Sequence, residues 1–418
     1  MKLFATDHPL TTGVDISSAT FWEHPFDVRE ASFARLRAEA PVSWHKPTQW
    51  YEPHDQKGFW AVTRAADIRA VSLDSAVFPS RYGVTLDPLN PDLATAASFF
   101  LTMDAPDHTR YRRLISMAFT PKAVAQITDR IEQNARSIVD GIIGAGDIDF
   151  VEACASRLPM ETVSDIVGVP ASQRERAALA AERLVGGADV PHDAPMDRVY
   201  AMLADEMFYL FGLGQELAAH RRAHPQDDLL TNLVSAEIDG HRLSDDDIGA
   251  FLVLLSVAGN DTTKQTTSIS MLRLQANPDQ RDWLLADFPG RIGTAVEEFV
   301  RHTSPVLQFA RTAARDTQLG GVEISAGDKV VLFYCSANRD ESVFCDPMRF
   351  DLSRSPNPHL GFGGGGAHFC LGNGVARTQL RAIFRELLTR VPRIDFGEPV
   401  HLVSNFINGI VSLPAHIG

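Results

Sequence analysis

The chain has 418 residues, which excludes a minimal binding module and leaves room for one large enzyme domain or for two or three smaller domains. Hydrophobic residues make up 44% and charged residues 22%, values that are typical of a globular protein and exclude disordered or fibrous chains. The 53 acidic residues outnumber the 39 basic ones, and the net charge of -14 disfavours nucleic acid as a partner.

Cysteine usage and the N-terminus indicate where the protein works. The four cysteines form no C-x-x-C pair and are too sparse for a disulfide scaffold, which favours a reducing, cytoplasmic location. The first residues lack the features of a signal peptide, and no run of about 18 apolar residues predicts a transmembrane anchor. No repeat or linker marks an internal boundary, so we expect one domain over residues 1–418, in which residues 1 to about 20 form an N-terminal extension.

Short strands are predicted near the two ends of the chain, with helices between them. The first strand lies at 58–64, and helical periodicity then dominates from about Pro121 to Leu285. Further strands are expected at 316–324 and 327–334, with a Gly-Gly turn, and at 401–406. The sequence therefore predicts a mainly α-helical fold with small peripheral β-sheets.

The longest predicted helix begins at Ser244 and runs to about Ala276. The Ser244 hydroxyl is a good N-cap, and three aspartates follow it in the first turn, where the helix dipole favours negative charge. At 1.5 Å per residue the helix is about 50 Å long, enough to cross the whole domain. Its first part, 248–258, is apolar on every side, which predicts a buried central helix.

A polar stretch, Ala258-Gly259-Asn260-Asp261-Thr262-Thr263, interrupts this buried helix. Burying such groups costs several kcal/mol unless they have partners. One interpretation is a widened helical turn at Gly259, with Asp261 and Thr262 delivering protons to a ligand that lies over the helix. The alternative is a polar notch on the surface, or a threonine hydroxyl bonded to the carbonyl four residues earlier.

Cys370 lies just before a second confident helix. Helix N-terminal N–H groups stabilise a thiolate, so this position predicts a lowered thiol pKa. The glycine run 363–366 lets a flat, bulky group approach the backbone closely. A buried, inert cysteine is the alternative, but a single thiolate with no cluster of other ligands fits an axial haem ligand better than a zinc site.

These motifs resemble those of a known family. The Cys370 loop resembles the haem-binding loop of the cytochrome P450 monooxygenases, at Phe362, Gly366, His368, Cys370 and Gly372. The stretch 258–262 is similar to the oxygen-activating helix of that family. An E-x-x-R pair at Glu298 and Arg301 and an early stretch from His108 to Arg112 follow the family order, although an isolated E-x-x-R is usually a surface ion pair.

The resemblance extends from about residue 20 to the C-terminus and implies a specific architecture and chemistry. It implies the cytochrome P450 fold, with haem b held between the long central helix and the Cys370 loop and with Cys370 as the iron ligand. It also implies that Asp261 and Thr262 manage protons during the activation of O2. Four residues would contact the haem propionates: His108, Arg112, Arg311 and His368. Glu298 and Arg301 would face inward and bind the segment near Arg354 or His359, a folding role.

The haem loop is one residue longer than the most common family spacing, since Phe362 lies eight residues before Cys370. This longer form resembles an actinobacterial subgroup that hydroxylates methyl-branched lipids and steroid side chains. Uncharged residues occupy the family's substrate-recognition positions and favour a hydrophobic substrate, although each is also compatible with ordinary core packing. These pocket candidates are Phe99, Phe100, Ala258, Gly259, Val306, Leu307, Phe309 and Phe406, and the stretch from Val185 to Pro195 resembles the lid.

The expected function is hydroxylation of a terminal methyl group on a branched lipid or isoprenoid. A steroid side-chain or secondary-metabolite hydroxylase, a peroxide-driven hydroxylase and a non-enzymatic haem protein that binds or senses lipids are the alternatives. No flavin-binding region or iron–sulfur cysteine spacing is present. We therefore expect a separate ferredoxin and ferredoxin reductase, which dock near Cys370 through arginines such as Arg112 or Arg113.

Overall fold

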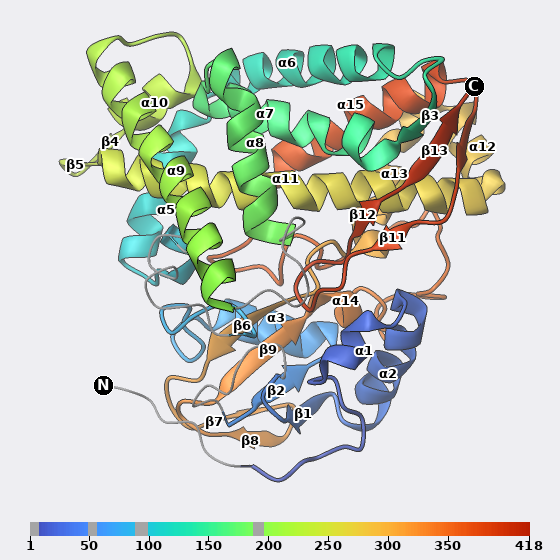
Figure 1. The fold of residues 1–418 in the computed structure, drawn as a ribbon. Coiled ribbons are helices and arrows are strands. Elements are labelled where there is room, and N and C mark those ends of the chain that lie inside the picture. The colour runs from blue at the N-terminus through green and yellow to red at the C-terminus, as the bar shows by residue number, and fades with distance from the viewer. Residues whose placement is uncertain (1–7, 49–56, 88–98, 187–195) are drawn as a thin grey trace.

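The computed structural model describes residues 8–48, 57–87, 99–186 and 196–418 (Figure 1). The described α-helices are α1 (Ala19–Glu23), α2 (Phe26–Glu39), α3 (Ala65–Leu73), α5 (Asp107–Ala118), α6 (Pro121–Asp140), α7 (Arg157–Val167), α8 (Ala171–Gly186), α9 (Met196–Ala223), α10 (Leu229–Ser235), α11 (Asp245–Ala276), α12 (Pro278–Ala286), α13 (Phe288–Thr303), α14 (Tyr334–Ala337) and α15 (Asn373–Arg390). The described residues also include a 3-10 turn, η1 (Phe99–Thr102), and a π-helical turn, η2 (Val151–Ala155).

The described strands form small separate sheets, as the sequence predicts. They are β1 (Val42–His45), β2 (Phe59–Val62), β3 (Gly146–Asp149), β4 (Glu237–Ile238), β5 (His241–Arg242), β6 (Gln308–Thr312), β7 (Thr317–Leu319), β8 (Val322–Ile324), β9 (Lys329–Phe333), β10 (Ile394–Phe396), β11 (Val400–His401), β12 (Ile410–Ser412) and β13 (Pro414–Ile417). The largest sheet has the order β1-β2-β9-β6 and lies with α1, α2 and α3 at one end of the molecule (Figure 1).

The strands near 316–334 and 401–406 differ from the prediction in detail. The stretch 316–324 is itself a hairpin, β7–β8, closed by Gly320 and Gly321, whose positive φ angles of 58° and 82° suit a two-residue turn. The stretch 327–334 contains β9, which pairs with β2 and β6 instead. Only the first residue of 401–406 is in a strand, because the following residues form a loop that packs against Pro305 and Leu307.

Helix α11 begins where the sequence predicts, at a capping box. The Ser244 hydroxyl accepts the Asp247 N–H at 3.1 Å, and the Asp247 carboxylate accepts the Ser244 N–H at 2.8 Å. Figure 1 shows α11 in yellow, running through the helical part of the molecule. It crosses α9 closely, since a Cβ on Gly214 would lie 2.7 Å from the Gly249 Cα.

The residues before α1 pack on the sheet through a histidine. The His8 ring lies 4.6 Å from the Trp44 ring and 4.9 Å from the Trp60 ring, and its Nε2 is 2.7 Å from a carboxylate oxygen of buried Asp328. Trp60 donates its indole N–H to the same carboxylate at 2.9 Å. The described part of the expected N-terminal extension is therefore held against β1 and β2.

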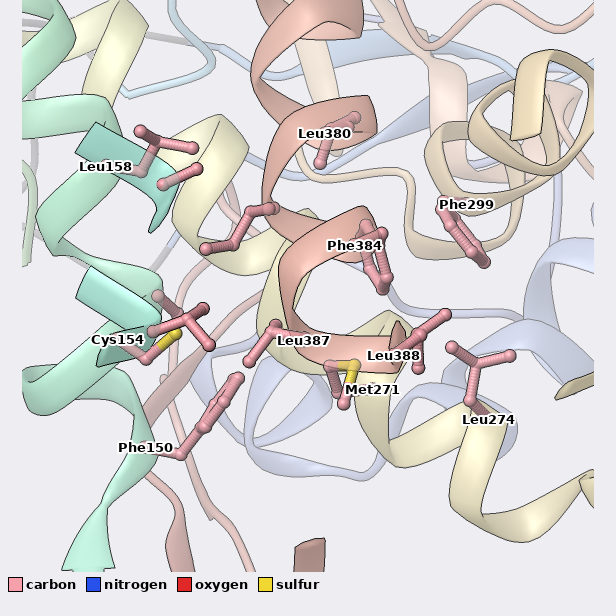
Figure 2. Packing of buried hydrophobic residues seen from close by; sticks show 14 of the residues in the cluster. Phe150, Cys154, Leu158, Met271, Leu274, Phe299, Leu380, Phe384, Leu387 and Leu388 are labelled. Carbon is pink, nitrogen blue, oxygen red and sulfur yellow. The ribbon is translucent and has the colours of Figure 1, made fainter. Parts of the chain in front are cut away.

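A hydrophobic cluster joins α11, α13, α15 and η2, and Figure 2 shows how it interlocks. The Phe384 ring of α15 stacks on the Phe299 ring of α13 at 4.3 Å, and both are fully buried. Cys154 of η2 lies in the same cluster, where burial raises the pKa of its thiol to about 12. This packing fixes α13, which carries the E-x-x-R pair, against the helix that follows Cys370.

Candidate functional site

The Cys370 loop folds back on itself just before α15. Cys370 donates its backbone N–H to the Phe362 carbonyl oxygen at 3.0 Å, and the Asn373 side-chain amide donates to the Cys370 carbonyl oxygen at 2.6 Å. Gly372 is the N-cap of α15, and a Cβ there would meet nothing within 4 Å. The loop therefore holds the sulfur at the helix terminus and leaves open space beside Gly372.

The pKa of the Cys370 thiol differs from the sequence prediction. Burial raises this pKa above its ordinary value, and the backbone N–H groups of Gly372 and Asn373, with the charges of Arg112 and Arg377, lower it only in part. The expectation of a lowered pKa is therefore wrong for the polypeptide alone, because desolvation of the thiolate outweighs the helix terminus. A bound metal ion would supply the missing stabilisation, since a coordinating thiol is deprotonated.

The glycine run 363–366 packs against α3, a contact that was not predicted from the sequence. A Cβ on Gly364 would lie 2.3 Å from the Ser72 hydroxyl of α3, and one on Gly366 would lie 2.4 Å from the Ser72 carbonyl oxygen. Gly366 also has a positive φ of 75°. Both glycines are therefore needed for the loop to pass along the end of α3.

Four basic side chains from three parts of the chain meet beside this loop. His108 and Arg112 lie one turn apart on α5, and the rings of His108 and His368 are 4.2 Å apart. Arg112 donates to the Phe369 carbonyl oxygen at 2.6 Å, and Arg311 of β6 is buried. Burial and the charge of Arg311 lead the causes that lower the pKa of His368 to about 3.

This cluster fits the acidic groups of haem. Burial, then the charge of Arg112, lowers the pKa of His108, whereas the negative charge of Asp104 raises it. The His108 Nε2 is buried and finds no hydrogen-bond partner among the described residues. A buried guanidinium such as that of Arg311 and an unpaired ring nitrogen are costly unless a polar or charged group compensates them, and two propionates would do so. The arrangement of His108, Arg112, Arg311 and His368 around Cys370 is thus compatible with haem b.

The polar stretch of α11 presents its side chains in two directions. Ala258 is exposed in the middle of an otherwise buried helix, and Thr262, one turn later, is half-buried. The Thr262 hydroxyl donates to the Ala258 carbonyl oxygen at 2.9 Å. The widened turn predicted at Gly259 is wrong, because α11 is α-helical throughout and the Cβ position of Gly259 faces Val163 of α7 at 3.0 Å. Gly259 therefore serves helix packing, and the exposed turn is at Ala258.

Asp261 points to the other side of α11. Its buried carboxylate lies 2.5 Å from the Lys264 ammonium. Both residues line a small pocket that also contains Glu182 of α8 and Asn260. The structure thus does not place the Asp261 carboxylate beside the Thr262 hydroxyl.

The pocket candidates divide into those with an open side and those in the core. The Phe309 and Phe406 rings meet edge to face at 5.3 Å, both are half-buried, and Val306 is half-buried beside them. Leu307 is fully buried in the cluster of Trp22 and Phe333, so its prediction as a pocket wall is wrong. Successive residues of an extended chain point to opposite faces, which separates Leu307 from its neighbours.

Of the remaining candidates, Phe99 and Phe100 lie near α5, whereas most of the predicted lid lies outside the described residues. Phe100 of η1 is buried, and its ring lies 5.8 Å from the His108 ring. Phe99 precedes it in the same turn. The predicted lid from Val185 to Pro195 falls mostly outside the described residues, which exclude 187–195.

The E-x-x-R pair is fully buried and joins α13 to the segment before the Cys370 loop. Glu298 and Arg301 form two hydrogen bonds of 2.7 Å, and Arg301 also donates to the carbonyl oxygens of Asn338, Pro347 and Arg349. Glu298 lies 3.4 Å from the Arg354 guanidinium, one of the two expected partners. His359, the other, instead lies 3.0 Å from the carboxylate of the adjacent Glu297.

Sequence reasoning missed Glu297 and its second partner, Arg377 of α15. Arg377 binds Glu297 through two hydrogen bonds of 2.6 and 2.9 Å. The consecutive glutamates 297 and 298 are the local signal that could have drawn attention to this position. Their partners lie far along the chain, so spacing alone could not identify them.

The two candidate docking arginines point in different directions. Arg112 is half-buried and engaged by the Cys370 loop, whereas Arg113 is exposed on α5. No helix in the described part of the chain is long and apolar enough to cross a membrane.

The chain is similar in sequence to proteins of one known family. The family model of cytochrome P450 matches residues 293–391, which include Glu298, Arg301 and Cys370. A methyl-branched lipid omega-hydroxylase of Mycobacterium tuberculosis is 40% identical over 406 residues, covering 96% of this chain and 94% of that protein. A steroid C26-monooxygenase of Mycolicibacterium smegmatis is 38% identical, covering 90% of this chain and 88% of that protein.

Solved structures give the same picture. A cytochrome P450 of Mycobacterium marinum in complex with pseudoionone is 51% identical, with a TM-score of 0.92, and covers 98% of this chain and 100% of that one. A cytochrome P450 from Novosphingobium aromaticivorans is 31% identical, with a TM-score of 0.84, over 97% of this chain and 100% of that one.

Proposed function

Because this chain belongs to the cytochrome P450 family, we propose that it hydroxylates the terminal methyl group of a methyl-branched or isoprenoid chain, with Cys370 as the iron ligand. Family membership makes it a haem-containing, oxygen-dependent hydroxylase of hydrophobic substrates. The observation that carries the site assignment is the meeting of four basic side chains beside a cysteine at the N-terminus of α15.

Haem supplies the iron centre at which dioxygen is activated. As its iron ligand, the Cys370 thiolate would donate electron density to the metal, which favours O–O cleavage. Arg112 and Arg311 would neutralise the two carboxylates, His108 and His368 would offer uncharged ring nitrogens for hydrogen bonds, and the four together would fix the orientation of the group.

Protons reach the site through α11. The Thr262 hydroxyl lies on the exposed turn and donates its proton to a backbone carbonyl, so its oxygen is oriented to accept a hydrogen bond from a group that carries a proton there. Asp261 pairs with Lys264 on the other side of the helix, where a small pocket contains Glu182. The Asp261 carboxylate and the Thr262 hydroxyl are not in contact, so in this proposal the two residues act on different faces of α11.

The substrate assignment rests on the pocket walls and the relatives. Phe309 of β6, Val306 just before it and Phe406 of the following loop offer apolar surface, and none of them carries a charge. Such walls bind a hydrophobic chain and hold its end in place. Oxidation of a strong primary C–H bond requires this restraint, because weaker C–H bonds must be kept away from the reacting centre. The named activity of the omega-hydroxylase and the pseudoionone complex both favour a branched chain, whereas the steroid C26-monooxygenases support a steroid side chain as the second candidate.

Electrons come from a separate ferredoxin and its reductase in this proposal, and Arg113 lies on the docking face. Arg113 is exposed on α5, the helix whose inner face binds the Cys370 loop. An unchanged rate of reduction at low salt after Arg113→Glu would contradict this assignment. A cytoplasmic location belongs to the same proposal, since all four cysteines are described and unpaired.

Two spectra test the proposal. The reduced protein with carbon monoxide should show the red-shifted Soret band of thiolate ligation, and Cys370→Ala should lack it. Branched lipids should shift the haem spin state at lower concentration than linear fatty acids or sterols. If the thiolate band is present but sterols bind preferentially, the substrate is a steroid side chain and not a branched lipid. If haem-loaded protein lacks the band, Cys370 is not the iron ligand.

A further inference from the structure

A second ion-pair network lies behind the Cys370 loop, beside the E-x-x-R pair but separate from it. Arg377 donates Nε and Nη2 to the two carboxylate oxygens of Glu297, at 2.6 and 2.9 Å, and His359 Nε2 lies 3.0 Å from the same carboxylate. Burial raises the pKa of Glu297, but hydrogen bonds from His359 and Arg377 outweigh it and bring the pKa to about 2. Glu297 is therefore a carboxylate at neutral pH.

Arg377 also closes a ring of contacts around the cysteine. Its guanidinium carbon lies 4.3 Å from the centre of the Phe362 ring, within the range of a cation–π contact. Its Nη1 donates to the Asn373 side-chain oxygen at 2.6 Å, and the Asn373 amide donates to the Cys370 carbonyl oxygen. The Cys370 backbone N–H donates a hydrogen bond to the Phe362 carbonyl oxygen, which closes the ring of contacts. A displaced Arg377 would disturb the cysteine through both Phe362 and Asn373.

The charge of Arg377 reaches the sulfur as well. Arg377 is one of two arginines, with Arg112, whose charge favours the thiolate of Cys370. The negative charge of the Glu297 carboxylate, which binds Arg377 through both oxygens, largely cancels the positive charge of Arg377. The network therefore combines a fixed geometry with a nearly cancelled charge.

We propose that Glu297 is a positioning residue for the haem ligand: it holds Arg377 across Phe362 and cancels the Arg377 charge, and so sets the electron density on the Cys370 thiolate. A bare cation near the thiolate would withdraw electron density from iron and favour the reduced metal. A bare carboxylate would do the reverse. This inference rests on the proposed role of Cys370 as the iron ligand.

Charge cancellation gives a signed prediction for the reduction potential of the haem-loaded protein. Glu297→Gln keeps the side-chain shape but exposes the Arg377 charge, so the potential should rise. A tenfold shift of the one-electron equilibrium corresponds to about 59 mV, and we expect a shift of up to this size. Arg377→Gln exposes the Glu297 charge and should lower the potential. The double variant lacks both charges and should return close to the wild-type value.

Two further variants separate charge from simple disruption. Glu297→Asp keeps the charge and should leave the potential near that of the wild type. Glu132→Gln removes the carboxylate partner of Arg385, which is also on α15 but is half-exposed and paired with α6, and should have no effect. The inference is wrong if both single variants shift the potential in the same direction, if neither shifts it, or if Glu297→Asp shifts it as much as Glu297→Gln.

The carbon monoxide spectrum keeps this test distinct from that of the proposed function. A thiolate band in the wild type and the variants shows that Cys370 ligation is intact, and the potentials then judge Glu297 alone. Absence of the band in the wild type would reject the role of Cys370 itself.

Discussion

Thr262 donates its hydroxyl proton to the Ala258 carbonyl oxygen on the exposed turn of α11. Thr262→Ala removes the ordered hydroxyl, so product formation should fall by roughly 100-fold, the lower range for loss of a general acid–base group. Oxygen consumption should continue without matching product. Oxygen and product are measured in the same reaction.

The matched control for Thr262 is one turn further along the helix. Thr266 donates to the Thr262 carbonyl oxygen with the same geometry, at 2.7 Å, but it is buried. Thr266→Ala should leave the ratio of product to oxygen unchanged. An equal loss in both variants would assign the effect to the helix and not to the Thr262 hydroxyl.

Asn405 fixes the loop that carries Phe406. Its side-chain amide donates to the Asp87 carboxylate at 2.5 Å, and Asp87 also accepts a hydrogen bond from Thr48. Hydrogen bonds to charged groups contribute about 1.5–3 kcal/mol, so Asn405→Ala should weaken binding of a branched substrate by about tenfold or more. Spectral titration checks this, and the oxidised position in the product should become less selective.

A loop anchor far from Phe406 serves as the comparison for Asn405. Asp316 accepts the Ala326 N–H at 2.8 Å beside the β7–β8 hairpin. Asp316→Ala should not change substrate binding. If Asn405→Ala binds and oxidises the substrate as the wild type does, the loop is not held by this contact.

Local residue patterns predicted much of the site. The Ser244 cap and the placement of Cys370 before α15 depend on neighbouring residues, which the sequence displays directly, whereas the burial of the Glu298–Arg301 pair was implied only by the family resemblance. The orientation of Leu307 could not be predicted, because it depends on the pairing of an extended segment with a distant loop. The Cys370 pKa also depends on burial by the whole fold.

Contacts between elements that are distant in the sequence account for most of the site features that were not predicted. Glu297 and Arg377 are 80 residues apart, and their contact requires the packing of α13 on α15. The glycine run is adjusted to Ser72 of α3, almost 300 residues away in the chain. Neither contact leaves a periodic or spaced pattern, so only the folded chain reveals it.

The contact between α13 and α15 depends on a pair of stacked, fully buried aromatic rings. Phe384 is fully buried and stacks on Phe299, as Figure 2 shows. Phe384→Ala should lower the free energy of unfolding by about 3–5 kcal/mol, the usual loss for a buried aromatic side chain. Denaturant unfolding measures this change. Leu179→Ala, at a half-exposed position on α8, should lower it by less than about 1 kcal/mol.

At the scale of the whole molecule, buried histidines make the stability depend on pH. Burial lowers the pKa of His45 to about 4, below the ordinary value of 6.5 that it has when unfolded. The unfolded chain therefore binds more protons in this window, and the contribution of His45 is complete above pH 6.5 and lost as the pH falls toward 4.

Replacement of this histidine tests the pH dependence. His45→Gln keeps a polar group next to the Ser43 hydroxyl, which lies 2.9 Å from the His45 Nε2. Between pH 6.5 and 4, its unfolding free energy should fall with pH less steeply than that of the wild type, by up to about 1.4 kcal/mol per pH unit. Parallel slopes in the two proteins would show that His45 is protonated alike in both states.

We propose that this P450 inserts one oxygen atom at the end of a methyl-branched chain. The most direct test of this proposal is mass spectrometry of the product after turnover of a branched lipid under isotopically heavy dioxygen, with a ferredoxin and reductase as electron source. We predict one heavy oxygen atom at the terminal methyl carbon. Hydroxylation mainly at internal carbons, or product oxygen that does not come from dioxygen, would contradict the account.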